Sequence, residues 1–232
     1  MMVPTDESKR VTSEVLSAVA SFAGLDVATQ EAISRAAIRR EYAAGQVVFL
    51  EGEPCAGLYV VQNGWLKSVK TSPSGREQVM RFVGPGEVFN EIGVLVGDAN
   101  LVTVIALEPA SVWIIHRDTL LRLMDEQPRL ARIITQNLAR RVQHLIGLVE
   151  DLSLRTVESR LARLLLEQSS ADVLARRRWA TQAEMAARLG TVPDVLNRAL
   201  RSLSEEGLIQ IERHQIQILD RKGLDDKVML SN

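Results

Sequence analysis

The sequence is poor in cysteine and histidine and carries almost no net charge. Its single cysteine, Cys55, excludes an internal disulfide and any zinc or iron–sulfur site built from several cysteines of one chain. A lone cysteine fits a reducing cytoplasm. The formal charge of −1 gives no bulk attraction to nucleic acid or to a membrane. Any contact with DNA must therefore come from a local basic patch.

Long apolar runs, clustered metal ligands and phosphate-binding loops are absent as well. No apolar run reaches membrane-spanning length, and residues 1–10 lack the apolar stretch of a signal peptide. We therefore expect a cytoplasmic protein with no membrane partner. His116, His144 and His214 lie in distant segments, and no Gly-rich P-loop occurs, so the sequence predicts neither a metal site nor a catalytic residue.

What is present is enough chain for two domains, 232 residues with 46% hydrophobic content. Residues 12–39 have helical periodicity in two runs, and Gly24 separates them. From residue 40 to residue 113 the period changes to two. Short β-rich runs alternate there with Gly/Pro turns, which predicts an antiparallel sandwich or barrel, most simply a jelly roll. We expect a third helix at residues 156–168 and a polar connection at residues 169–178.

The central stretch, PRLARIITQNLARRVQHLIGLVEDLSL, predicts one long helix over residues 128–154. Apolar side chains recur along it at spacings of three and four, as in the seam of a two-stranded coiled coil, and only Arg141 interrupts them. The predicted dimer seam consists of Ala131, Ile134, Leu138, Leu145, Leu148 and Leu152. A second apolar stripe lies beside the seam, at Ile133, Val142, Ile146 and Val149. We interpret the helix as a dimer helix that also supports a domain on its flank. The alternative is a helix buried in a single core.

A helix-turn-helix with a β wing is predicted near the C-terminus. Thr181 suits the N-cap of a first helix, and Gly190 suits a turn of positive φ. Pro193 suits the first turn of a second helix. Residues 208–211 and 215–219 then alternate as two strands around a turn at residues 213 and 214.

The second helix of this motif carries side chains suited to reading DNA. Asp194, Asn197 and Arg198 lie on one outward face, and Arg201 extends that face. Arg198 matches a guanine, Asn197 an adenine, and Asp194 a cytosine amino group. Phosphate contacts are predicted for Thr181, Gln182, Arg188 and Arg201. The alternative is a solvated charged face, but the caps, the turn and the wing all occur in the expected order.

The chain resembles the CRP/FNR family of bacterial transcription regulators over nearly its whole length. The resemblance rests on TQAEMAARLGTVPDVLNRALRSLSEEGLI, on AAGQVVFLEGEPCAGLYVVQNGWLKSV and GPGEVFNEIGVL, and on LARRVQHL in the long helix. It implies an α+β fold with three parts. They are an N-terminal antiparallel β jelly-roll sensor domain (residues 12–127), a dimerisation helix (128–154) and a C-terminal winged helix-turn-helix domain (155–232). It implies double-stranded DNA, a second copy of the chain and RNA polymerase as partners. Pro193 departs from the family pattern and leaves the preferred half-site open.

The resemblance also marks a ligand pocket in the sensor domain. Its cyclic-AMP-binding members present a Gly-Glu and an Arg-Ser pair, where this chain has Asn90-Glu91 and Leu101-Val102. The adenine-facing positions of the long helix correspond to Leu145 and Ile146, beside His144. Leu and Val offer a phosphodiester neither a cation nor a donor. We therefore expect that the effector is not cyclic AMP bound in the usual way.

The apolar replacements leave three alternatives for the sensor open. One is an apolar or aromatic ligand such as heme, with His144 as an iron ligand in a regulator that senses nitric oxide or carbon monoxide. Another is an empty, permanently competent dimer, and the third is a small metabolite. A different class of function, a sensor that regulates a partner protein without DNA, is also open. In that case, replacing Arg198 would have no effect.

Overall fold

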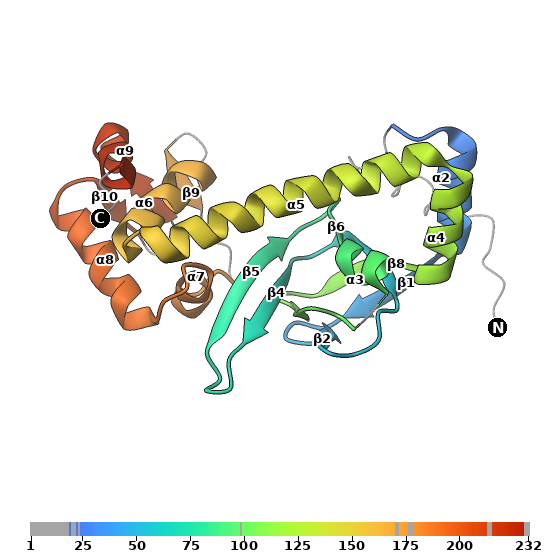
Figure 1. Ribbon diagram of the computed structural model, residues 1–232. Helices are drawn as coiled ribbons and strands as arrows, with labels where there is room; N and C mark the ends of the chain where they lie inside the picture. The colour runs from blue at the N-terminus through green and yellow to red at the C-terminus, as the bar shows by residue number, and fades with distance from the viewer. Residues whose placement is uncertain are drawn as a thin grey trace. The chain divides into compact units, whose positions relative to one another are not determined.

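The computed structural model describes Val19, Phe22 and residues 24–97, 99–169, 172–175, 179–212 and 215–229. Most of the first predicted helical run and the turn at residues 213 and 214 lie outside the described residues. The chain divides into two compact units, one formed by Met1–Lys70 and Met80–Val142, the other by Thr71–Val79 and Gln143–Asn232. The boundary falls inside α5 (Pro128–Leu154), a single helix with the predicted bounds (Figure 1).

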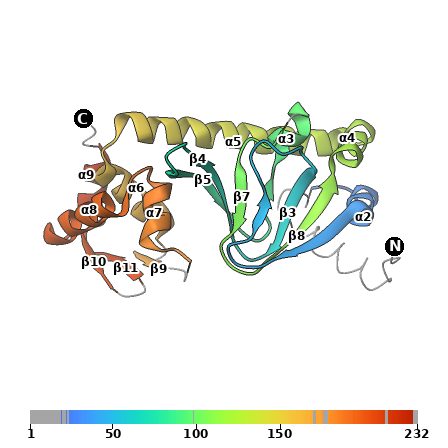
Figure 2. The same cartoon turned by 90° about the horizontal axis from the view of Figure 1, so that it is seen from below.

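The first unit contains two antiparallel sheets of four strands each. One has the order β1 (Ala37–Tyr42), β8 (Ala110–His116), β3 (Gly57–Asn63) and β6 (Val88–Phe89). The other has the order β2 (Val47–Phe49), β7 (Thr103–Ala106), β4 (Leu66–Thr71) and β5 (Glu77–Val83). The beginning of β5, residues 77–79, belongs to the second unit. Figure 2 shows β3 and β8 of the first sheet side by side, and it also labels β7 of the second sheet. The predicted antiparallel β domain is confirmed.

Strands β3 and β8 bury both of their faces. On one face Tyr59 and Val112 join Phe49 of the other sheet in a single apolar cluster, which forms the core between the sheets. On the opposite face Leu58 and Trp113 join a cluster contributed by helices. Successive residues of a strand point to opposite faces, so the nearly continuous apolar runs of β3 and β8 are those of strands covered on both sides.

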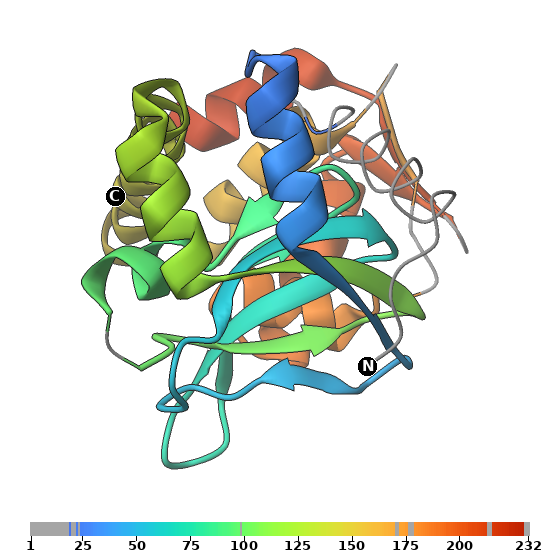
Figure 3. The same ribbon diagram turned by 90° about the vertical axis from the view of Figure 1, so that its right-hand side faces the viewer.

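Helices α2 (Val27–Ala36) and α4 (Arg117–Glu126) cover the outer face of the first sheet, together with the beginning of α5. Figure 3 shows α2 in blue and α4 in yellow-green, side by side. The Asp26 carboxylate caps α2 by accepting the Thr29 amide at 2.9 Å. The predicted helix was expected to continue to Arg39, which is wrong, because Ala37–Tyr42 forms β1 and pairs with β8. A short helix, α3 (Glu91–Val96), was not predicted.

The second unit is built around α6 (Val157–Gln168), α7 (Gln182–Arg188) and α8 (Pro193–Glu205). These helices share one apolar core with the wing strands β10 (Ile209–Ile211) and β11 (Gln215–Ile218). A third strand, β9 (Val173–Ala175), pairs with β11 and lies in the segment predicted to be a polar connection. Helix α9 (Arg221–Met229), which was also not predicted, packs on α6, and its Leu224 is fully buried.

Candidate functional site

The helix-turn-helix forms where the local sequence signals place it. Thr181 is the N-cap of α7, and its Oγ1 accepts the Glu184 amide at 3.2 Å. Gly190 follows α7 with φ +65°, a conformation that residues with a Cβ rarely adopt. Pro193 is the first residue of α8, where its missing N–H costs no hydrogen bond. The cap, the glycine and the proline therefore fix the start of α7, the turn and the start of α8.

Helix α8 presents polar side chains along one face. Asp194, Arg198 and Arg201 are exposed, and Asn197 is half-buried. Leu196, Leu200 and Leu203 occupy the other face and are buried in the core of the unit. This division leaves the predicted reading residues accessible near the beginning of the helix. A side chain must be accessible there to reach base edges in the major groove.

The predicted phosphate contacts divide into two groups. Thr181 and Gln182 are exposed at the N-terminus of α7, where the helix dipole favours an anion. Arg188 lies at the opposite end of α7, and its Nη1 donates to Gln168 Oε1 of α6 at 2.7 Å. Burial lowers the pKa of Arg188. One N–H group of its guanidinium is therefore used within the unit, and a phosphate contact of Arg188 stays a prediction.

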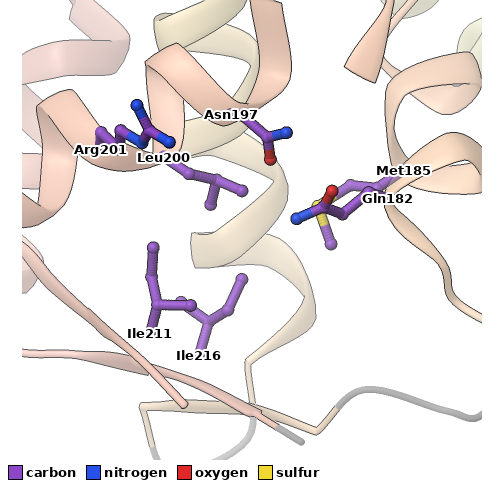
Figure 4. A pocket seen from close by; sticks show the side chains of 7 residues that line it. All are labelled: Gln182, Met185, Asn197, Leu200, Arg201, Ile211 and Ile216. Atoms are coloured by element: carbon purple, nitrogen blue, oxygen red, sulfur yellow. The ribbon is translucent and has the colours of Figure 1, made fainter. Parts of the chain in front are cut away.

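A cavity of about 260 Å³ opens between α7, α8 and the wing. Three of the predicted DNA-contacting residues, Gln182, Asn197 and Arg201, lie at its edge, and Figure 4 shows their side chains around it. The remaining lining residues are Met185, Leu200, Ile211 and Ile216. This cavity could not be predicted from sequence patterns, because its walls come from two helices and two strands that are separated along the chain.

Asn90, the residue before α3, forms hydrogen bonds to neighbouring segments of the first unit. It adopts φ +73° ahead of α3, a conformation that asparagine tolerates better than most residues. Its Nδ2 donates to the Gly57 carbonyl at 3.1 Å and to Asn100 Oδ1 at 3.1 Å, and it lies 3.3 Å from Cys55 Sγ. The Asn90 amide is thus used within the unit, and Cys55, whose thiol pKa is raised by burial, is packed beside it.

Glu91 stands next to Asn90 and is buried, with 9% of its surface exposed. Burial raises the pKa of its carboxyl, and the positive charges of Arg81 and Arg141 act in the opposite direction. Arg81 is paired with Glu87 at 3.0 Å. Burial and the charge of Arg81 lower the pKa of Arg141 to about 10. Glu91 was a predicted pocket residue, but its electrostatic interaction with Arg81 and Arg141 was not predicted, although the interruption of the apolar seam by Arg141 was a signal of it.

The other predicted pocket residues are divided between the two units. Leu101 is 48% exposed, whereas Val102 packs against the core between the two sheets. His144, Leu145 and Ile146 belong to the second unit. His144 and Ile146 are exposed there, and Leu145 is half-buried. Among the described residues, no group of three or more His, Cys, Asp or Glu side chains could hold a metal ion.

The raised pKa of Glu91 predicts a pH-dependent effect of Glu91→Gln on stability. The carboxyl has an ordinary pKa of 4.5, and folding raises it. Ionisation of Glu91 therefore costs stability, from the point where the pH rises through 4.5 until it exceeds the folded-state pKa. We expect the free energy of unfolding of the variant, relative to the parent, to increase over this range and then level off. Urea titrations at several pH values measure this difference, and a difference independent of pH would contradict the assignment.

Helix α5 carries an apolar stripe that no other described part of the same chain covers fully. Val142, Ile146 and Val149 have exposed fractions of 55%, 63% and 63%. In contrast Ile134, which we predicted to lie in the dimer seam, is fully buried in the core of the first unit. The predicted seam is therefore corrected at Ile134, because this side chain has no surface left for a second copy. The outward stripe consists mainly of residues that were assigned to the flank of the seam.

An antiparallel β domain, a long helix and a winged helix-turn-helix with an accessible reading face define a DNA-binding regulator. Two domain families match the chain, the Cyclic nucleotide-binding domain at residues 39–127 and the Crp-like helix-turn-helix domain at residues 159–227. The protein belongs to the CRP/FNR family of transcription regulators. The matched relatives are regulators and not enzymes.

Curated relatives align along most of their length. The CRP-like cAMP-activated global transcriptional regulator of Mycobacterium tuberculosis is 25% identical over 217 residues, which cover 91% of this chain and 97% of the relative. The Cyclic AMP receptor protein of Thermus thermophilus is 27% identical over 191 residues, covering 81% and 87% of the two chains. FixK2 from Bradyrhizobium japonicum has a similar structure, with a TM-score of 0.72, 25% identity and coverage of 82% of this chain and 96% of that chain.

The helices among the described residues include none with the length and apolar character that a membrane span requires.

Proposed function

We propose that the protein acts as a homodimer that binds a near-palindromic DNA site and responds to a ligand in its β domain. The observation that carries this proposal is the exposed face of α8, with Asp194, Asn197 and Arg198 near its beginning. Two copies of this face, related by a two-fold axis, would read two half-sites. Since relatives of this chain are transcription regulators, we include RNA polymerase among the proposed partners.

Dimerisation through α5 is supported by its exposed apolar stripe. Val142, Ile146 and Val149 are spaced by four and three residues, the spacing at which side chains of one helix meet a parallel copy. Three large apolar side chains exposed in a row are unusual for a surface that faces only water. Leu145, Leu148 and Leu152 border this stripe and remain in the proposed seam.

For the effector we propose a ligand other than cyclic AMP bound in the usual mode. The side chains at the positions of the family's Arg-Ser pair, Leu101 and Val102, provide no charge and no hydrogen-bond donor. The Asn90 amide already donates to groups of its own unit. Arg81 is already paired with a carboxylate. His144 is exposed on α5 in its own chain, and heme with His144 as an iron ligand is the alternative effector.

Fluorescence anisotropy with labelled duplexes tests the proposal. A site with half-site centres spaced by roughly 34–36 Å should bind tightly, and insertion of about five base pairs between the half-sites should weaken binding, because one reading head then faces the wrong side of the helix. Affinity should fall steeply with salt. Added cyclic AMP should leave the curve unchanged, whereas a shift at micromolar cyclic AMP would refute the effector proposal. A Soret band in the purified protein would instead favour heme.

A further inference from the structure

The cavity between α7, α8 and the wing is half open and lined mainly by apolar side chains. Its floor is apolar, since Met185 is 8% exposed, Leu200 6% and Ile216 1%. Ile211 of β10 lines the same cavity and is 41% exposed, so that an apolar side chain stands at its open side. Figure 4 shows these four side chains converging from α7, α8 and the two wing strands.

The rim of this cavity is polar and carries one positive charge. Gln182 and Asn197 contribute side-chain amides, and Arg201 contributes a guanidinium. An arginine offers two parallel N–H groups that match a carboxylate, and such charge-assisted hydrogen bonds are among the stronger polar contacts. None of the lining residues is acidic. The cavity therefore combines a buried apolar surface with a cationic edge.

The dimensions narrow the class of ligand. Sites for drug-sized molecules typically measure roughly 300–1,000 Å³, and they are mostly apolar with a few polar groups that fix the orientation of the ligand. A cavity of about 260 Å³ lies just below this range. It suits a compact molecule with one acidic group and an apolar body, such as a short fatty acid.

We propose that this cavity binds a small monocarboxylic acid with an apolar body, its carboxylate on Arg201 and its hydrocarbon over Met185, Leu200 and Ile216. A bound acid would occupy the groups that the proposed function assigns to DNA, so acid and DNA would exclude each other. This second step rests on the proposed function, whereas binding of the acid does not. The cavity would make the reading head itself a regulatory site, independent of the β domain.

Octanoate is the probe, and calorimetry with the full-length chain is the measurement. We expect saturable binding with one octanoate per chain, and no comparable binding of octanol, which lacks the negative charge. Arg201→Gln should raise the octanoate Kd about tenfold or more, because the charge-assisted hydrogen bonds are lost. Ile211→Trp should block the open side of the cavity and abolish binding. An unchanged thermal unfolding midpoint would show that each variant is folded.

Arg198→Gln is the matched control, since Arg198 is exposed on the same helix and does not line the cavity. It should leave octanoate binding intact and weaken DNA binding, whereas Arg201→Gln should weaken both. On the parent chain, octanoate should raise the apparent Kd for DNA linearly with the octanoate concentration, because the two ligands exclude each other. Absence of saturable octanoate binding, or equal binding by the parent and Arg201→Gln, would overturn the site. Octanoate binding without competition would leave the site standing and overturn only its link to DNA.

Discussion

Arg198→Ala should lose affinity for the specific DNA site by about 1–3 kcal/mol for each half-site, and it should no longer discriminate the guanine that Arg198 reads. Arg198 is exposed on α8, five residues after Pro193 begins the helix, so its replacement removes no buried contact. The loss should therefore appear in binding and not in the unfolding midpoint. Competition between the cognate duplex and one with the guanine replaced, at fixed salt, measures it.

Two controls distinguish base reading from simple charge attraction. Arg198→Lys keeps the positive charge but cannot form the bidentate contact, so it should lose discrimination and retain the salt dependence. Arg201→Ala should weaken binding to all sequences by a similar factor and lower the salt slope by about one phosphate contact. If Arg198→Ala bound the cognate duplex with parental affinity and discrimination, Arg198 would not be the guanine reader. If the parent itself discriminated no duplex, a regulator that acts on a partner protein without DNA would become the better hypothesis.

Local signals explain why the helix-turn-helix could be predicted from the sequence. The cap at Thr181, the positive φ of Gly190 and the position of Pro193 depend on neighbouring residues only. The nearly continuous apolar runs of β3 and β8 are equally local. Neighbouring residues determine these features, and distant segments do not change them. The predicted and the observed structure therefore agree at these positions.

The errors occur where distant segments decide the structure. The end of the predicted helix became β1 because β8, more than 70 residues later, pairs with Ala37–Tyr42. The polar segment that contains β9 is a strand because β11 pairs with it. In both cases the backbone finds its hydrogen bonds in a remote strand, and tertiary pairing overrides local propensity.

The residue types at the candidate sites could be predicted from the sequence. The groups that these side chains contact could be predicted less well. Arg188 has the charge of a phosphate ligand, but its charge does not predict that Gln168 of α6 accepts a hydrogen bond from it. Ile134 and Ile146 have the same apolar character on one helix, yet the first is buried in its own chain and the second is 63% exposed. Periodicity reveals that a residue is apolar and on which face it lies, but not whether the surface covering it belongs to the same chain or to a second copy.

Ile146→Arg should convert the proposed dimer into single chains. Ile146 is exposed in the middle of the stripe between Val142 and Val149, so the substitution costs little within one chain. Across a two-fold axis it would bury two like charges without partners, which is strongly unfavourable. Light scattering should then report the mass of one chain. Loss of the second reading head should also weaken DNA binding by about 10²–10⁴-fold, because the two half-sites no longer bind as a linked pair.

Gln136→Arg is the matched control, since Gln136 is exposed on α5 outside the stripe. It adds the same charge to the same helix and should leave both the mass and the DNA affinity unchanged. A dimer that survives Ile146→Arg would place the interface on another surface, and the corrected seam would be wrong. A monomer that still bound the palindromic duplex with parental affinity would break the link between the α5 stripe and DNA recognition, because two unlinked heads cannot match the affinity of a linked pair.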